Sequence, residues 1–164
     1  MTTRVPQDGE VLRLGTVEKF CEIWYDVSLN ILHIQAPTSS TSNTPVNSID
    51  IAAGGKVTFN GRATETQATN KSTGVTLNNR AGAITMNNEA LAGAAEVTFI
   101  VTNSVVAAND VVIVNHASAG TSGAYLVDAN AIGAGVVSVT VSNVSGGSLS
   151  EAIVINFLVL GTAT

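Results

Sequence analysis

The chain has little cysteine and little histidine, and this scarcity excludes several kinds of site. Cys21 is the only cysteine, so no disulfide can form within the chain. His33 and His116 are the only histidines. One cysteine and two distant histidines cannot build a zinc site by themselves, and the sequence contains no D-x-[DN]-x-[DN]-G calcium loop. We therefore expect no metal and no other cofactor.

Basic residues are absent from the second half of the chain. All seven lie in the first eighty positions: Arg4, Arg13, Lys19, Lys56, Arg62, Lys71 and Arg80. Contacts between cationic side chains and phosphate dominate the affinity of proteins for nucleic acid, so we expect no nucleic-acid binding. The net charge of −5 is interpreted as a contribution to solubility.

Long hydrophobic runs are also missing, although the mean hydropathy is +0.34. No stretch approaches the roughly 18 uninterrupted apolar residues of a membrane-spanning helix. The first residues include Arg4, Asp8 and Glu10 and contain no apolar segment typical of a signal peptide. We expect no membrane insertion, and folding in the cytoplasm.

The residues that are abundant favour β-structure. Hydrophobic residues make up 45% of the chain and charged residues 12%, about half the usual charged fraction. Val, Ala and Ile supply most of the apolar content, and Thr, Ser, Asn and Gly supply most of the polar content. β-Branched residues suit a pleated sheet, and small polar residues suit turns, so the composition predicts an all-β fold.

Short apolar segments separated by turn residues follow one another in the second half. We predict seven strands, at Gly74–Leu77, Ala83–Met86, Glu96–Thr102, Asp110–Asn115, Ala124–Val127, Val136–Ser142 and Ala152–Leu160. The glycine-rich segments 133–135 and 146–147 are interpreted as hairpin turns and not as phosphate-binding loops. This spacing predicts an antiparallel β-sandwich or jelly-roll-like body.

Two of these segments are nearly continuously apolar. Asp110–Val114 and Ile153–Leu160 lack the alternation seen at Val97, Phe99 and Val101. The pattern predicts strands that are covered on both faces, and in a small sandwich the second cover can be another subunit. Left at an open edge, such a strand would promote aggregation, which favours an oligomer.

The first part of the chain differs from the rest. The alternation in Glu22–Gln35 predicts one long strand, with a helix over Gly15–Tyr25 as an alternative. Ala36–Ser48 contains two prolines and many Ser and Thr residues, as a linker does. Ile49–Asn60 predicts two short strands around a Gly-Gly turn. We therefore predict an N-terminal arm and linker at 1–48 and a body at 49–164.

The reactive side chains do not form a recognisable catalytic pattern. His116 could be combined formally with Asp110 or Asp128, but a separation of six strand residues places Asp110 about 20 Å from His116. Cys21 has no histidine near it in sequence. A carboxylate pair drawn from Glu89, Glu96 and Glu151 remains an alternative, with few aromatic residues to support a sugar. We expect no enzymatic activity.

Several segments together resemble a known family. They are Ala68–Asn79 (ATNKSTGVTLNN), Gly82–Leu91 (GAITMNNEAL), Val97–Ser104, Asp110–Asn115 and Asn143–Phe157 (NVSGGSLSEAIVINF). In series they are similar to a β-sandwich module of tailed-bacteriophage virion proteins, with the resemblance clearest over 68–164. The module is found in capsid decoration (cement) proteins and at the tips of tail appendages.

The resemblance implies a structural virion protein. The preferred expectation is a homotrimeric decoration protein that binds the outside of a phage head, contacts the major capsid protein or another virion protein, and stabilises the head. The alternative is a receptor-binding module of a tail fibre or spike. A fibre needs a long shaft, and the residues before the module contain no heptads and no collagen-like repeat, so decoration is preferred.

The N-terminal arm contains the residues that protein interfaces favour. Aromatic side chains supply apolar contact area, and cationic side chains pair with carboxylates on a partner. The candidate virion-contact residues are Arg4, Arg13, Lys19, Phe20, Trp24 and Tyr25. The alternative is that the three aromatic residues fill the protein's own core.

Overall fold

The computed structural model describes residues 12–16, 19–26, 31–35, 48–59 and 61–161, and all regular elements in them are strands. The all-β prediction is confirmed. The chain divides into two compact units, Met1–Gly61 and Arg62–Thr164, which are described separately below.

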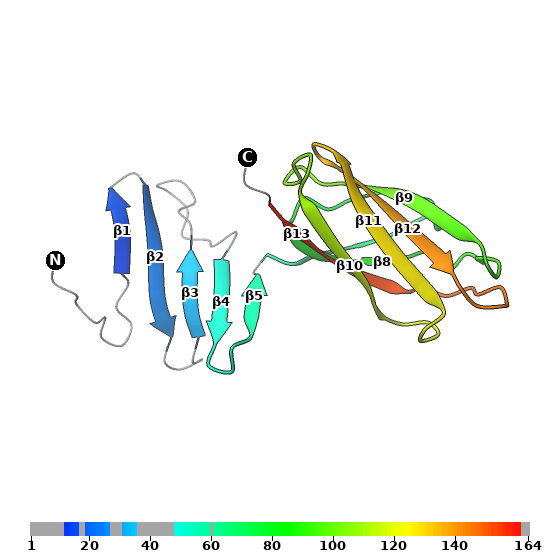
Figure 1. Cartoon of the computed structure of the whole chain (residues 1–164), viewed down its shortest axis with the longest axis horizontal. Helices are drawn as coiled ribbons and strands as arrows, with labels where there is room; N and C mark the ends of the chain where they lie inside the picture. Colours follow the sequence, from blue (N-terminus) through cyan, green and yellow to red (C-terminus); the bar gives the residue numbers. More distant parts are fainter. Residues whose placement is uncertain (1–11, 17–18, 27–30, 36–47, 60, 162–164) are drawn as a thin grey trace. The chain divides into compact units, whose positions relative to one another are not determined.

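The N-terminal unit contains one five-stranded antiparallel sheet whose strand order follows the chain (Figure 1). The strands are β1 (Leu12–Thr16), β2 (Lys19–Asp26), β3 (Ile31–Gln35), β4 (Ser48–Ala52) and β5 (Val57–Phe59). The predicted single strand Glu22–Gln35 is wrong, as is its helical alternative, because β2 and β3 are two paired strands. Alternation continues on both sides of the reversal, so periodicity alone does not detect it.

The predicted hairpin around Gly54 and Gly55 is confirmed. Gly55 has a φ of 78°, and its backbone N–H donates to the Ala52 carbonyl at 2.8 Å. However, β4 pairs with β3, so this hairpin belongs to the N-terminal sheet and not to the body. The two units meet at Gly61/Arg62 instead of the predicted 48/49. Of the predicted linker, residues 36–47 lie outside the described residues and Ser48 begins β4, which pairs with β3.

The body is a sandwich of two four-stranded sheets. Its strands are β6 (Ala63–Thr66), β7 (Val75–Thr76), β8 (Ala81–Thr85), β9 (Glu96–Thr102), β10 (Val111–Ser118), β11 (Tyr125–Gly133), β12 (Val136–Asn143) and β13 (Val154–Leu160). One sheet has the order β10-β13-β8-β6 and the other β11-β12-β9-β7. We call them the β13 sheet and the β12 sheet. The chain crosses between them at every connection except the β11–β12 hairpin.

Two features of the body differ from the prediction. Strand β6 was not expected, because Thr64, Glu65 and Thr66 are exposed and polar and give no apolar alternation. Strand β6 runs parallel to β8, and β7 runs parallel to β9. Each sheet is therefore antiparallel except at the edge that β6 or β7 forms. Both parallel strands are short, at four and two residues.

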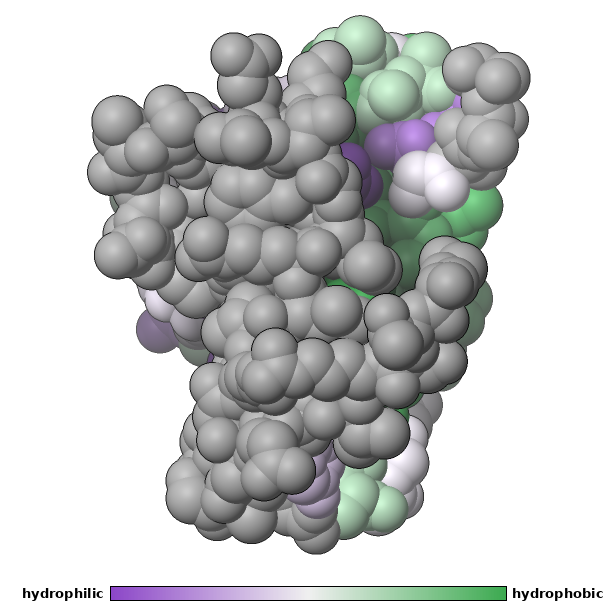
Figure 2. All heavy atoms as spheres, turned by 90° about the vertical axis from the view of Figure 1, so that its left-hand side faces the viewer, coloured by the Kyte–Doolittle hydropathy of each residue, from purple (hydrophilic) through white to green (hydrophobic). Residues whose placement is uncertain are grey.

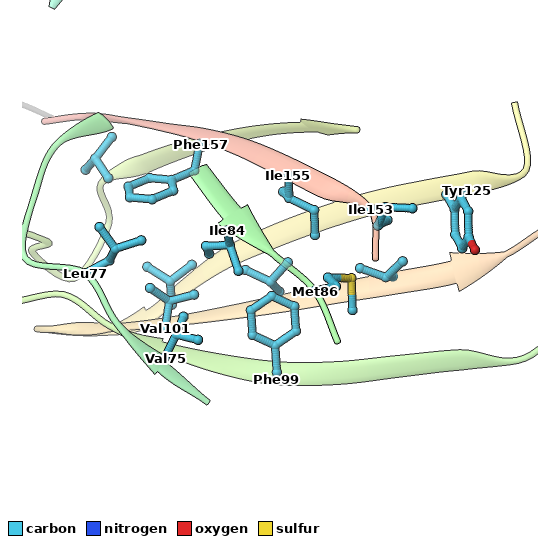
Figure 3. Packing of buried hydrophobic residues seen from close by; sticks show 14 of the residues in the cluster. Val75, Leu77, Ile84, Met86, Phe99, Val101, Tyr125, Ile153, Ile155 and Phe157 are labelled. Carbon is cyan, nitrogen blue, oxygen red and sulfur yellow. The ribbon is translucent and has the colours of Figure 1, made fainter. Parts of the chain in front are cut away.

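Alternating apolar residues fill the space between the two sheets. In β12 every second residue is buried, and Val139 lies opposite Phe99 of β9 in the ladder. Figure 3 shows Phe99 pointing from its strand across the core towards Met86, near Ile84 and below Ile155. Elsewhere in the core, Gly82 leaves room for the side chain of Phe157, since a Cβ at position 82 would lie 2.5 Å from the Phe157 ring. The core consists entirely of residues from the second unit.

The two continuously apolar segments differ from their prediction. Strand β13 lies inside its sheet, between β10 and β8, and only every second residue is fully buried. Strand β10 is an edge strand, and Val111 and Ile113 are 50% and 48% exposed. Among the described residues, therefore, β10 is covered on one face only, and cover of its other face by another subunit stays a prediction.

Replacement of a core residue should destabilise the body strongly. We expect Phe99→Ala to lower the free energy of unfolding by about 3–5 kcal/mol, because it removes buried contacts and leaves a cavity. Ile132→Ala, at a residue that is 61% exposed, should change it by about 0.5 kcal/mol or less. Urea unfolding monitored by circular dichroism measures both. Equal effects of the two substitutions would contradict the assignment of the core.

Candidate functional site

The structure gives local hydrogen-bond partners to the residues that a catalytic triad would need. His116 lies in β10, and its Nε2 is 2.6 Å from the Ala119 carbonyl oxygen. Asp110 precedes β10 and accepts a hydrogen bond from the Ala107 N–H, whereas Asp128 lies in β11 and accepts one from Asn130. Each of these side chains therefore makes a contact close to it in sequence. In the described part of the chain, no three His, Cys, Asp or Glu residues are grouped so that they could hold a metal ion.

Most polar contacts of the body gather at one end, which we call the loop end. It comprises the connections 67–74, 86–95, 119–124 and 144–153. These meet because β6, β8 and β10 end there and β13, which runs antiparallel to β8 and β10, begins there. The two segments that contribute most to the family resemblance, NKSTG and SGGSLSE, both lie at this end.

Lys71 is a buried cation that joins three of these connections. Its side chain is 2% exposed. The ammonium group donates to the carbonyl oxygens of Asn87 at 2.5 Å and of Glu151 at 2.6 Å. Burial lowers the pKa of Lys71, and the nearby carboxylates of Glu89 and Glu151 oppose that shift. Carbonyl oxygens of the protein itself compensate the charge of Lys71. Its role is therefore structural: it links its own loop to the connections that contain Asn87 and Glu151.

The loop that carries Lys71 is held by its neighbours. Gln67 is 2% exposed, and its Nε2 donates to the carbonyl oxygens of Lys71 and Thr73. Its Oε1 accepts from the Asn87 N–H. Asn70 Oδ1 accepts from the Ser72 N–H and from the hydroxyls of Ser72 and Thr73. The polar residues of the NKST segment therefore determine the shape of this loop.

Glu151 fixes the connection between β10 and β11. Its Oε2 accepts from the Thr121 N–H at 3.0 Å and from the Tyr125 hydroxyl at 2.8 Å, and its Oε1 accepts from the Thr121 hydroxyl at 2.8 Å. The Tyr125 ring meets His116 edge-on, with 5.5 Å between ring centroids. All three hydrogen bonds favour an ionised carboxylate.

The pKa shifts follow from these contacts. Hydrogen bonds from Thr121, and then from Tyr125, lower the pKa of Glu151. Burial first, and then the hydrogen bond to Glu151 and its negative charge, raises the pKa of Tyr125 to about 12. A carboxyl group that stays ionised is a poor general acid. The geometry thus gives Glu151 a structural role and offers no support for the paired-carboxylate alternative.

Asn143 completes the loop end. Its side chain is fully buried, and Nδ2 donates to the carbonyl oxygens of Leu91 and Gly147, both at 2.8 Å. Its Oδ1 accepts from the N–H and the hydroxyl of Ser145. The SGGS segment is therefore anchored through an asparagine that precedes it. Sequence reasoning quoted this segment but assigned no role to Asn143, Lys71 or Gln67, each of which has at least one partner 16 or more residues away in the chain.

The candidate virion-contact residues lie on the N-terminal sheet where they are described. Arg13 is in β1, and Lys19, Phe20, Trp24 and Tyr25 are in β2, whereas Arg4 lies outside the described residues. The ladder pairs Arg13 with Glu22 and Trp24 with His33. Tyr25 is 44% exposed and pairs with Leu32. Their role in contacting a virion stays a prediction.

Comparison with protein-family models, with curated proteins and with solved structures finds no match. The family resemblance is therefore supported only by the sequence segments themselves. None of the described residues belongs to a helix long and apolar enough to cross a membrane.

Lys71 provides a test of the loop end. Lys71→Met keeps the length of the side chain but leaves the carbonyl groups of Asn87 and Glu151 without this donor. We expect the free energy of unfolding to fall by about 1–3 kcal/mol. Lys56→Met, at an exposed residue of the β4–β5 turn, is the matched control and should have no measurable effect. Urea unfolding of both variants provides the measurement, and equal stabilities would contradict the role of Lys71.

Tyr125 provides a second test through its own titration. In a Tyr25→Phe background Tyr125 is the only tyrosine, and its absorbance at 295 nm should titrate near pH 12. Because this pKa lies above the usual value of a tyrosine, about 10, the stability that Tyr125 contributes is complete below pH 10 and is lost as the pH rises towards 12. Adding Glu151→Gln should lower the pKa while leaving it above its usual value, because burial remains. No change on that substitution would contradict the hydrogen bond.

Proposed function

We propose that the protein is a structural component of a bacteriophage particle, a decoration protein that binds the outside of the head and stabilises it. The family resemblance of 68–164 supplies the identity of the particle. One observation carries the proposal. Three residues of the resembling segments, Lys71, Asn143 and Glu151, hold the connections of the loop end together through side-chain hydrogen bonds. Such residues build a rigid scaffold.

The distribution of polar groups supports a binding role over catalysis. Among the described residues, every buried side-chain nitrogen or oxygen has a hydrogen-bond partner. Functional sites commonly contain groups with unmet hydrogen bonds or carboxyl groups whose pKa is raised. Glu151, which the sequence suggested as one member of a carboxylate pair, has a lowered pKa instead.

The N-terminal unit is the proposed virion anchor. It carries four of the seven basic residues, Arg4, Arg13, Lys19 and Lys56. It also has its own sheet, which is separate in sequence from the core of the body. An anchor of this kind leaves the sandwich free to cover the particle surface.

A receptor-binding module of a tail fibre or spike is the second candidate, and the loop end favours it. Fixed loops lose little conformational entropy when they bind a ligand. The loop end exposes small polar side chains that can form hydrogen bonds with a glycan or a protein, namely Thr69, Ser72, Asn88, Ser122, Ser148 and Ser150.

Removal of the N-terminal unit separates the two candidates. The deletion must end at Gly61, because a deletion ending at Ala36 would leave β4 without its partner β3. We expect residues 62–164 to remain folded, since they contain a complete core, and to lose binding to phage heads that lack this protein. Co-sedimentation with heads measures binding, and full-length Leu126→Glu, altered at an exposed residue of β11, is the positive control.

Two results would overturn the proposal. Undiminished binding by residues 62–164 would place the contact on the sandwich and not on the N-terminal unit. A full-length protein that ignores heads but binds host cells would favour the tail-appendage candidate.

A further inference from the structure

The connection between β10 and β11 has an exposed tip, residues 119–123, which we call the tip. It consists of Ala, Gly, Thr and Ser. Figure 2 shows described hydrophobic residues, coloured green, at the surface beside hydrophilic ones, coloured purple. The tip is different, because it has no large hydrophobic side chain that could pack against the body. Its conformation therefore depends on hydrogen bonds.

The backbone of the tip includes conformations that L-residues rarely adopt. The φ angle is 58° at Ala119, 73° at Gly120 and 78° at Gly123. Ala119 carries a Cβ, so its positive φ adds steric strain. A backbone hydrogen bond of 3.2 Å, from the Ala124 N–H to the Thr121 carbonyl oxygen, closes the end of the tip. A strained, exposed segment of this kind needs further contacts to keep one conformation.

Glu151 supplies these contacts from the connection that precedes β13. Its carboxylate accepts hydrogen bonds from the N–H and the hydroxyl of Thr121 and from the hydroxyl of Tyr125. A Cβ at position 120 would lie 2.9 Å from Glu151 Oε2, so only glycine leaves room for the carboxylate. The carboxylate therefore lies directly against the backbone of the tip.

The segment that carries Glu151 is held independently of its carboxylate. The Lys71 ammonium group donates to the Glu151 carbonyl oxygen at 2.6 Å. Ile153 is fully buried, and its carbonyl oxygen accepts from the Met86 N–H at 2.9 Å. When the contact between carboxylate and tip is broken, the tip is therefore the part that moves.

Three ionisable groups face the carboxylate, from three elements: His116 of β10, Tyr125 of β11 and Lys71 of the connection 67–74. Burial raises the pKa of Tyr125 to about 12, so this residue keeps its proton in acid. The His116 Nε2 lies 2.6 Å from the Ala119 carbonyl oxygen, which can only accept. Both the neutral and the charged imidazole can carry the required N–H, so protonation of His116 leaves this hydrogen bond intact.

We propose that the Glu151 carboxylate is an acid-sensitive latch, which holds the tip while it is ionised and releases the tip when it is protonated, with the sandwich core still closed. Protonation turns one oxygen into a donor and removes the charge that strengthens the hydrogen bonds from Thr121 and Tyr125. The core stays closed because it contains only apolar residues and Tyr125.

The direction of the pH effect follows from the same contacts. The hydrogen bonds from Thr121, and then the one from Tyr125, lower the pKa of Glu151, and the field of His116 adds to them. The stability that this carboxylate gives to the tip is therefore complete above the usual pKa of glutamic acid, about 4.3, and is lost as the pH falls below that value. Exposed groups of the tip such as Ser122 thus keep one arrangement at neutral pH and lose it in acid.

Amide hydrogen exchange followed by NMR tests the latch in the full-length chain. After correction for the intrinsic exchange rate at each pH, we expect the Thr121 amide to be protected at about pH 6 and to lose this protection below about pH 4.3. The Val139 amide lies in β12, between two paired strands, and should stay protected over the same range. No particle or partner is present, so the result is independent of the proposed virion function.

Three substitutions identify the group that titrates. Glu151→Gln keeps the shape of the side chain without its charge, so protection of Thr121 should be weaker than in the wild type at about pH 6 and should not change in acid. Glu96→Gln, at an exposed carboxylate of β9, is the matched control and should keep the wild-type behaviour. His116→Gln retains a donor N–H and should also keep the loss of protection in acid.

Four results would overturn the inference. They are a Thr121 amide without protection at about pH 6, protection that persists in acid, loss of protection at Thr121 and Val139 at the same pH, and an acid transition that survives Glu151→Gln but not His116→Gln. The last result would assign the transition to the imidazole. If Glu151→Gln does not fold, the comparison of Thr121 with Val139 in the wild type decides the question.

Discussion

The body depends on the closure of two apolar sheet faces over one another. In β9 and β12 of the β12 sheet, every second residue points inward, and the residues between them are mostly Thr and Ser. Neither sheet could keep its inner row out of water alone, because the free energy gained comes from burying both rows together. The chain crosses from one sheet to the other at nearly every connection. The packing of the sheets therefore determines where the loops meet.

Closure of the sandwich buries polar groups at its ends, and the chain satisfies them with a few specific side chains. At the loop end these are Lys71, Gln67 and Asn143. At the opposite end Asn103, which is 1% exposed, donates to the Asn79 carbonyl oxygen and accepts from the Val105 N–H. An unpaired buried donor or acceptor costs about 1–3 kcal/mol, so each of these residues constrains the fold beyond its own contacts.

Lys71 shows most clearly how the cost of burying a polar group is offset by its hydrogen bonds. Burial disfavours its charged form, and the lowered pKa records that cost. Two carbonyl oxygens and the field of two carboxylates offset it. The same arrangement joins a segment before β7 to one before β13, eighty residues later. The residues of these segments are in this way structural, because their side chains hold the loops of the chain itself.

Sequence periodicity predicted much of the body and little of the loop end. Alternation located β9 and β12, because one face of each is buried and the other is polar. It failed at Glu22–Gln35, where two paired strands continue the same period, and at Ala63–Thr66, where an edge strand has no apolar row. The hydrogen bond from Lys71 to the Glu151 carbonyl oxygen could not be predicted from the sequence, because no local pattern shows which connections will lie side by side. A single lysine in a segment otherwise composed of Asn, Ser, Thr and Gly was the only available signal.

The two units meet the same requirement in different ways. The body covers its inner apolar rows internally, although Val111 and Ile113 of β10 are 50% and 48% exposed. The N-terminal sheet has equally regular rows but only one layer among its described residues. A face that merely tolerated apolar residues would not place them in register on four adjacent strands while keeping Asp50 and Thr58 on the other side. This regularity gives the N-terminal sheet one largely apolar face and one more polar face, a pattern typical of a sheet that packs on one side.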